Sequence, residues 1–84
     1  MEYKKYVAVV ARFNKQGLIV PLSIEWEDGH IYEIDRIIDT RRAASMKAGG
    51  SGIRYTCMIS GHKRYLYYED PAWFVPAKGL EGEN

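Results

Sequence analysis

Two tyrosines and several cations in the second half of the chain are the side chains best suited to bind a ligand. Tyr65 and Tyr67 lie two positions apart in a strand-like segment, so both rings should project from one face. Such rings can stack on the bases of single-stranded nucleic acid, and neighbouring cations can bind its phosphates. The candidate binding residues are Arg54, Met58, Lys63, Tyr65, Tyr67 and, in the loop before them, Lys47.

A β-hairpin over residues 53–69 is the element that would position these side chains. Gly61 and His62 supply its turn, and a glycine suits the first central position of a type II′ turn. Because side chains alternate along each strand, the candidate residues share one face and an apolar set shares the other. The apolar set, which we expect in the core, is Ile53, Tyr55, Cys57, Ile59, Leu66 and Tyr68.

The candidate face also has a purely structural interpretation. Tyrosine is a favoured strand residue in any sheet. The predicted turn places Arg54 opposite Glu69, with which it would form an ion pair. The same register lets Tyr65 cover Met58. Contact with nucleic acid, contact with a protein and the absence of any ligand therefore remain open for this face.

The chain shows no arrangement typical of an enzyme. Ser60 and His62 lie close together in sequence, but the turn glycine between them explains that order, and no third group is placed to orient the imidazole. The acidic residues between positions 25 and 39 alternate as the solvent-facing residues of strands do. We expect a protein that is not an enzyme and has no catalytic residues.

Metal and cofactor sites are not indicated either. Cys57, His30 and His62 are the cysteine and histidines of the chain, and none has the paired spacing of a zinc site. The glycine-rich residues 49–52 lack the lysine and the following helix of a phosphate-binding P-loop. We expect neither a metal nor a cofactor.

Size and composition predict one small globular domain. The chain has 84 residues, of which 46% are hydrophobic and 27% charged, and its one cysteine cannot form an internal disulfide. Its apolar runs are far shorter than the roughly 20 residues that cross a membrane. We expect a domain over residues 1–76, a flexible tail over residues 77–84, a cytoplasmic location and no membrane partner.

The first half of the chain reads as strands. Residues 3–13 are rich in valine and aromatic residues, and residues 14–17 supply a turn. The next segment alternates, and its apolar residues of one parity are Leu18, Val20, Leu22, Ile24 and Trp26. This pattern predicts a half-buried strand that presents all five to the core. Pro21 has no backbone donor, so the strand should be an edge or bend there.

A three-residue loop at residues 27–29 is predicted from the hydrophobic pattern. It pairs Ile24 with Tyr32 and Leu22 with Ile34, so that apolar residues share a face. Gly29 would close the loop in the left-handed region. A two-residue turn would instead mix core and surface residues.

The middle of the chain is less regular. Ile37 and Ile38 are adjacent apolar residues, which indicates a bulge or bend. Residues 40–48 fit either a short helix or an extended segment, and we favour the extended form. Together these elements predict an all-β fold, a small and strongly bent barrel of five to six strands, similar to Src-homology-three domains.

The chain also resembles a known family. The resemblance lies in the strings IEWEDG (24–29), YEIDRI (32–37), RYT (54–56), YLYYE (65–69) and WF (73–74). Their order is similar to that in a family of short bacterial β-rich proteins of unknown function, which is associated with genes for Y-family translesion DNA polymerases. The resemblance implies a bacterial origin and a neighbourhood of DNA repair. It assigns no catalytic or binding residue.

Taken together, the sequence predicts a small non-enzymatic binding or accessory module. Its first candidate partner is single-stranded nucleic acid, bound by the aromatic and basic hairpin face. The alternative is an interaction module without nucleic-acid binding, whose partner is a larger bacterial protein or a second copy of the chain.

Overall fold

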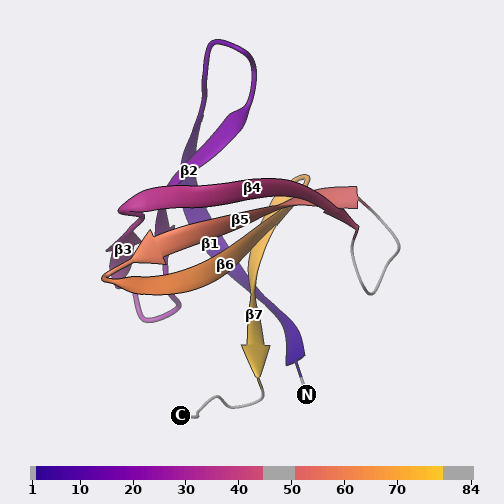
Figure 1. Cartoon of the computed structure of the whole chain (residues 1–84). Coiled ribbons are helices and arrows are strands. Elements are labelled where there is room, and N and C mark those ends of the chain that lie inside the picture. The colour runs from indigo at the N-terminus through magenta and orange to yellow at the C-terminus, as the bar shows by residue number, and fades with distance from the viewer. Residues whose placement is uncertain (1, 45–50, 79–84) are drawn as a thin grey trace.

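Seven antiparallel β-strands form one curled sheet (Figure 1). The computed structural model describes residues 2–44 and 51–78. The strands are β1 (Glu2–Phe13), β2 (Ile19–Glu25), β3 (Ile31–Glu33), β4 (Arg36–Ala44), β5 (Ser51–Ile59), β6 (His62–Glu69) and β7 (Ala72–Lys78). The described residues contain no helix, so the predicted all-β class is confirmed, with seven strands where five to six were expected.

The order of strands in the sheet is β3-β2-β1-β7-β6-β5-β4. β3 and β4 follow one another in the chain yet lie at the two ends of this order, so the sheet curls back on itself. Two backbone hydrogen bonds from the segment that links β3 to β4 stabilise this curled form of the sheet. The Ile34 N–H donates to the carbonyl of Leu22 at 3.0 Å, and the Asp35 N–H donates to the carbonyl of Met58 at 2.8 Å. The result is a half-barrel whose concave face becomes the core.

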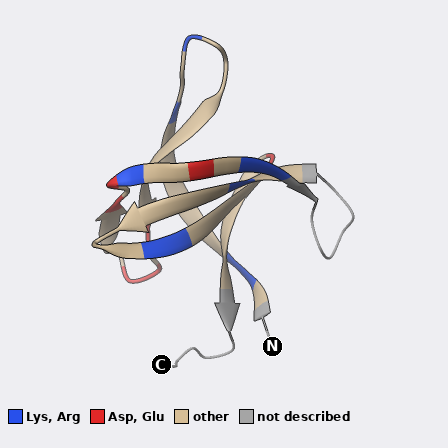
Figure 2. Cartoon of the chain, viewed as in Figure 1, with Lys and Arg blue, Asp and Glu red and all other residues tan. Residues whose placement is uncertain are grey.

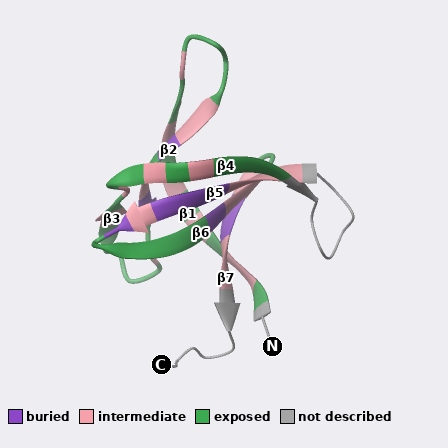
Figure 3. Cartoon of the chain, in the orientation of Figure 1, coloured by how far each residue is buried: buried purple, intermediate pink, exposed green. Residues whose placement is uncertain are grey.

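The core lies on the concave face, where the predicted apolar set gathers (Figure 3). Its buried members are Ile24, Tyr55, Cys57, Ile59, Leu66 and Trp73. Ile53 and Tyr68 are partly buried and pack against this cluster, so the predicted core face of the 53–69 hairpin is confirmed. The Tyr55 hydroxyl donates a 2.6 Å bond to the carbonyl of Ile19, which ties β5 to β2 across the interior.

The three-residue loop after β2 is also confirmed. The Trp26 N–H donates to the His30 carbonyl at 2.8 Å, and the Gly29 N–H donates to the Trp26 carbonyl at 2.8 Å. Gly29 has φ 87°, in the left-handed region that glycine adopts without strain. The pairing of Ile24 with Tyr32 follows from this loop.

Two bulges change the alternation that the sequence suggests. The β1–β2 register shifts between Val10 and Ala11, so Leu22 has no partner on β1. Leu22 is 41% exposed, whereas Pro21 is fully buried. The prediction that Leu18 and Leu22 face the core with Ile24 was therefore wrong: Leu18 is 62% exposed, and an unpaired residue reverses the phase of a period-two pattern.

The second bulge lies in β4 and was expected. The register shifts between Ile37 and Asp39, which leaves Ile38 as the extra residue. Ile37 packs against the core, while Ile38 points outward and is exposed. Adjacent apolar residues thus face opposite ways, as a bulge permits.

The turn of the 53–69 hairpin differs from the predicted one. Ile59 pairs with His62, which makes Ser60 and Gly61 the two central residues. Both have positive φ, 52° and 80°, and this is the mark of a type I′ turn rather than type II′.

The register of β5 and β6 consequently shifts by two residues from the predicted one. Arg54 lies opposite Tyr67 rather than Glu69, and Met58 lies opposite Lys63 rather than Tyr65. A shift of two preserves the parity of every side chain, so both predicted faces survive the change.

The ends of β4 and β7 can be compared with the predicted boundaries only as far as the described residues extend. β4 extends through residue 44, which confirms an extended form for residues 40–44, and residues 45–48 lie outside the described part. β7 continues to Lys78, although Pro76 was expected to end regular structure. Beyond Phe74, β7 pairs with β1 alone, and a strand with one unpaired edge tolerates a proline. Residues 79–84 of the predicted tail are likewise outside the described residues.

Candidate nucleic-acid interface

A row of side chains crosses the convex outer face of four strands. Arg54 on β5 lies opposite Tyr67 on β6, Tyr67 lies opposite Phe74 on β7, and Phe74 lies opposite Tyr6 on β1. At a spacing of about 4.8 Å between strands, these three steps span about 14 Å. Tyr65 lies beside the row, two residues from Tyr67 on the same face. We call Tyr6, Tyr65, Tyr67 and Phe74 the aromatic band.

The rings of the aromatic band contact one another. Tyr67 stacks on Phe74 with ring centres 5.0 Å apart and planes 2° apart, and Tyr6 meets Phe74 edge-on at 5.8 Å. Phe74 is buried beneath these contacts, whereas Tyr6 is 62% exposed and Tyr65 is 39% exposed. The band therefore has a packed centre and two accessible ends, at Tyr6 and Tyr65.

Cations lie on the rings of the aromatic band. The Arg54 guanidinium is 5.0 Å from the centre of the Tyr65 ring, and the Lys4 ammonium is 4.8 Å from the centre of the Phe74 ring. The Nε of Arg54 is buried and has no hydrogen-bond partner among the described residues. Within the described residues the Arg54 guanidinium thus contacts the Tyr65 ring and forms no ion pair with a carboxylate.

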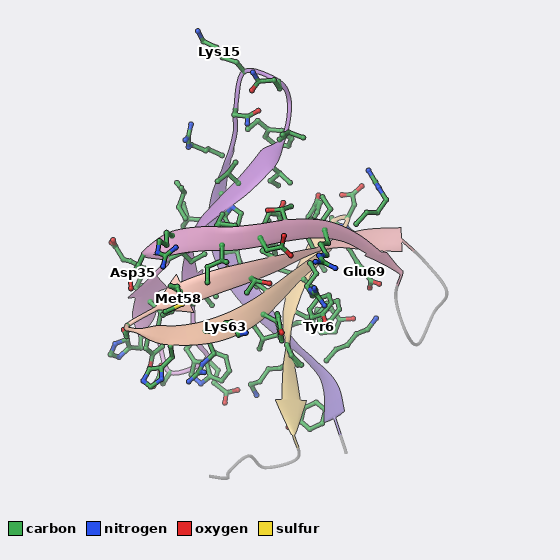
Figure 4. All side chains as sticks on the ribbon, viewed as in Figure 1. Tyr6, Lys15, Asp35, Met58, Lys63 and Glu69 are labelled. Atoms are coloured by element: carbon green, nitrogen blue, oxygen red, sulfur yellow. The ribbon has the colours of Figure 1, made fainter. Side chains whose placement is uncertain are left out.

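Two further cations, Arg36 and Lys63, lie on the same outer face between β4 and β6. Arg36 pairs with Met58, which pairs with Lys63, so these three residues form a second row across β4, β5 and β6. Figure 4 marks the two ends of the surface, with Met58 and Lys63 at one and Tyr6 at the other. Figure 2 shows basic residues at both ends of β4 and on β6. Within the described part of the chain, Arg36, Arg54 and Lys63 form no ion pair.

Five of the six sequence-predicted site residues therefore share one face. They are Arg54, Met58, Lys63, Tyr65 and Tyr67. Lys47, the sixth, lies outside the described residues. Arg41 pairs with Arg54 and so belongs to the same face, although its Nε binds the Asp39 carboxylate at 2.9 Å. Arg42 pairs with Ile53 and has the opposite parity.

The sequence analysis missed Tyr6, Phe74 and Lys4. All three join the site because β1 pairs with β7, and Lys4 also forms a 3.0 Å ion pair with Glu69. The alternation of Lys4 and Tyr6 along β1 was a usable signal for one face. Nothing in the sequence pattern indicated which strand would lie beside that face.

Three side chains that the sequence analysis considered for chemistry or metal binding have defined surroundings in the structure. No group of three or more metal-ligating side chains gathers in residues 2–44 and 51–78. Cys57 is fully buried, and this burial raises the pKa of its thiol to about 11, which suppresses the reactive thiolate. The backbone N–H of Ser60 donates to the Asp35 carboxylate at 3.0 Å, which shows Asp35 bound to the hairpin turn.

Comparison of the chain with protein-family models, curated proteins and solved structures finds no match. Among the residues that the structure describes, no helix has the length and apolar character needed to cross a membrane.

Proposed function

We propose that this protein is a non-enzymatic module that binds single-stranded nucleic acid on its outer face. The observation that carries the proposal is the aromatic band beside three cations, Arg36, Arg54 and Lys63, that form no ion pair within the described residues. Tyr6 and Tyr65 offer exposed rings for bases, and Arg36, Arg54 and Lys63 offer charges for phosphates. Bases can stack on such rings whatever their sequence, so the proposed binding is tolerant of sequence.

The accessible ends of the aromatic band make the sharpest test. Fluorescence anisotropy with a labelled single-stranded oligonucleotide should show binding by the wild-type chain. Tyr65→Ala should weaken that binding by about 1–3 kcal/mol, because it removes one stacking platform. The double variant Tyr65→Ala with Tyr67→Ala should weaken it further.

Phe13→Ala is the matched control for these variants. Phe13 is an aromatic residue with 70% exposure on the hairpin of β1 and β2, outside the aromatic band. Its removal should leave affinity unchanged. Equal losses in Phe13→Ala and Tyr65→Ala, with both proteins folded by circular dichroism, would contradict the proposed location. Absence of wild-type binding at low salt would remove the proposal itself.

A second candidate function is protein contact through the β1–β2 hairpin. This hairpin projects beyond the rest of the sheet (Figure 1), and its apolar residues Val10, Phe13 and Leu18 are all more than half exposed. Exposed apolar side chains gathered on a projecting element favour an interaction surface. Sedimentation at high concentration tests self-association there: a strictly monomeric species would argue against it, and a dimer should be weakened by Phe13→Ser.

A further inference from the structure

β6 and β7 are paired along only part of their length. They pair at Tyr67 with Phe74, Tyr68 with Trp73 and Glu69 with Ala72, and the pairing stops there. From that point β6 pairs with β5 and β7 pairs with β1, so the two strands diverge (Figure 1). Beyond the last pair, residues 62–65 of β6 and residues 75 and 76 of β7 lie on either side of a gap, and both sets line one pocket.

A pocket of about 490 Å³ occupies this gap. Its volume lies within the range of about 300–1,000 Å³ that is typical of small-molecule sites. The lining residues come from five strands and their turns, and they include Trp26, Tyr32, Lys63, Arg64, Tyr65 and Val75. The pocket thus combines core residues with residues of the outer face.

The walls of the pocket suit a planar aromatic group. Trp26 and Tyr32 contribute two rings, and aliphatic side chains such as Val75 contribute apolar surface. His30 stacks on Tyr32 with ring centres 4.4 Å apart, and the Lys5 ammonium lies 5.7 Å from the centre of the Trp26 ring. Each of the two rings therefore has a neighbouring side chain against it.

The rim of the pocket suits an anion and a hydrogen-bonding edge. Lys63 and Arg64 place cations on opposite faces of β6 beside the opening. Because this part of β6 pairs on one side alone, every second residue directs its backbone N–H and C=O into the gap. Of these edge groups, the Lys63 carbonyl accepts a 3.0 Å bond from the Arg64 guanidinium, which holds that cation at the edge of the gap. A ligand with a flat apolar face, polar edges and an adjoining phosphate matches this set of groups.

The pocket is continuous with the proposed nucleic-acid surface. Lys63 and Tyr65 line the pocket and also belong to the outer face that carries the aromatic band. We propose that the pocket receives one unstacked base of the nucleic-acid strand bound across the outer face, while Lys63 and Arg64 bind the phosphates beside that base. This inference rests on the proposed function, and it adds the pocket as a second part of the nucleic-acid binding site.

An abasic walk along the ligand tests the inference with the wild-type protein. A short single-stranded oligonucleotide is prepared intact and with one base removed at each position in turn. Loss of the base that enters the pocket should weaken binding from about fivefold to about a hundredfold, the range that base–aromatic stacking contributes. That loss should persist in Tyr6→Ala, because Tyr6 is an exposed ring of the aromatic band and is not among the residues that line the pocket.

A pocket-filling variant identifies the site. In Val75→Phe, removal of the base at the sensitive position should no longer lower the affinity, because the new ring already occupies the pocket. Val10→Phe is the matched control, since Val10 is exposed on β1 and does not line the pocket. In a Trp73→Phe background, quenching of the remaining Trp26 fluorescence by the intact strand, and its loss with the sensitive abasic strand, would support the assignment.

The two proposals fail in different ways. If the intact strand binds and every abasic strand binds equally well, the pocket inference is overturned and the proposed function stands. The pocket inference is likewise overturned, and the proposed function stands, if removal of the base at the sensitive position weakens binding to Val75→Phe as much as binding to the wild-type protein. If the intact strand does not bind at low salt, both proposals fall.

Discussion

Replacing Lys63 by glutamine should reduce the salt dependence of nucleic-acid binding. Lys63 is exposed, forms no ion pair within the described residues and lies between the aromatic band and the opening of the β6–β7 gap. Its charge can therefore be removed without breaking an ion pair among the described residues. The change isolates the contribution of one cation.

The expected magnitude follows from the number of cations without ion-pair partners. Each phosphate contact on a single strand contributes about −0.7 to the slope of log affinity against log salt. Arg36, Arg54, Lys63 and Arg64 form no ion pair within the described residues and together should give a slope of about −2.8, so raising salt from about 50 to about 200 mM should weaken wild-type binding about 50-fold. Lys63→Gln should have a slope of about −2.1 and lose only about 20-fold.

Anisotropy titrations at four or five salt concentrations measure both slopes. Lys15→Gln is the matched control, because Lys15 lies at the tip of the β1–β2 hairpin, far from Lys63 (Figure 4). Its slope should equal that of the wild-type protein. An unchanged slope in Lys63→Gln, or an equal decrease in Lys15→Gln, would refute the location of the phosphate contacts.

Three further predictions concern stability. Gly29→Val should destabilise the fold by about 1–3 kcal/mol, because φ at this position is 87°; an unchanged urea midpoint would contradict the loop conformation. Gly52→Ala should cost about 1–3 kcal/mol, because its Cβ would lie 2.7 Å from the Tyr68 carbonyl oxygen; a wild-type Tm would contradict that close approach. Burial raises the pKa of the Cys57 thiol from its ordinary value of 9.0 to about 11, so the unfolded chain loses this proton first as pH rises. Stability should therefore fall between pH 9 and 11 by up to about 2–3 kcal/mol, and this part of the decrease should vanish in Cys57→Ala; parallel pH profiles of the two proteins would count against it.

Parity explains why the faces of the β5–β6 hairpin could be predicted while its register could not. Burial of Tyr55, Cys57 and Leu66 depends on alternation alone, and alternation is unaffected by a shift of two residues. The register depends on whether Gly61 takes the first or the second central position of the turn. Both positions accept positive φ in hairpin turns, and the choice also requires Ser60 to adopt φ 52°. Local sequence does not decide between them.

The parts of the site that the sequence did not predict depend on contacts between residues that are far apart in the sequence. Tyr6 and Phe74 meet because β1 pairs with β7, and no turn connects those strands to reveal the pairing. The bulge at Leu22 is similar, since its extra residue is defined by the partner strand. Pro21 indicated a bend but not which neighbour would lose its partner. Long-range pairing, rather than propensity, is what the sequence pattern leaves undetermined.

The strand order also has a consequence for how the chain folds. Every pair of neighbouring strands in the sheet is a hairpin of consecutive strands, except β1 with β7. Two meanders, β1 to β3 and β4 to β7, can therefore form from local contacts at a small entropic cost. The β1–β7 ladder joins them and requires closure of nearly the whole chain, which is the slowest kind of contact to form. The aromatic band crosses that ladder, so Tyr6, one of its two accessible ends, joins the proposed binding surface in the same step that unites the two meanders.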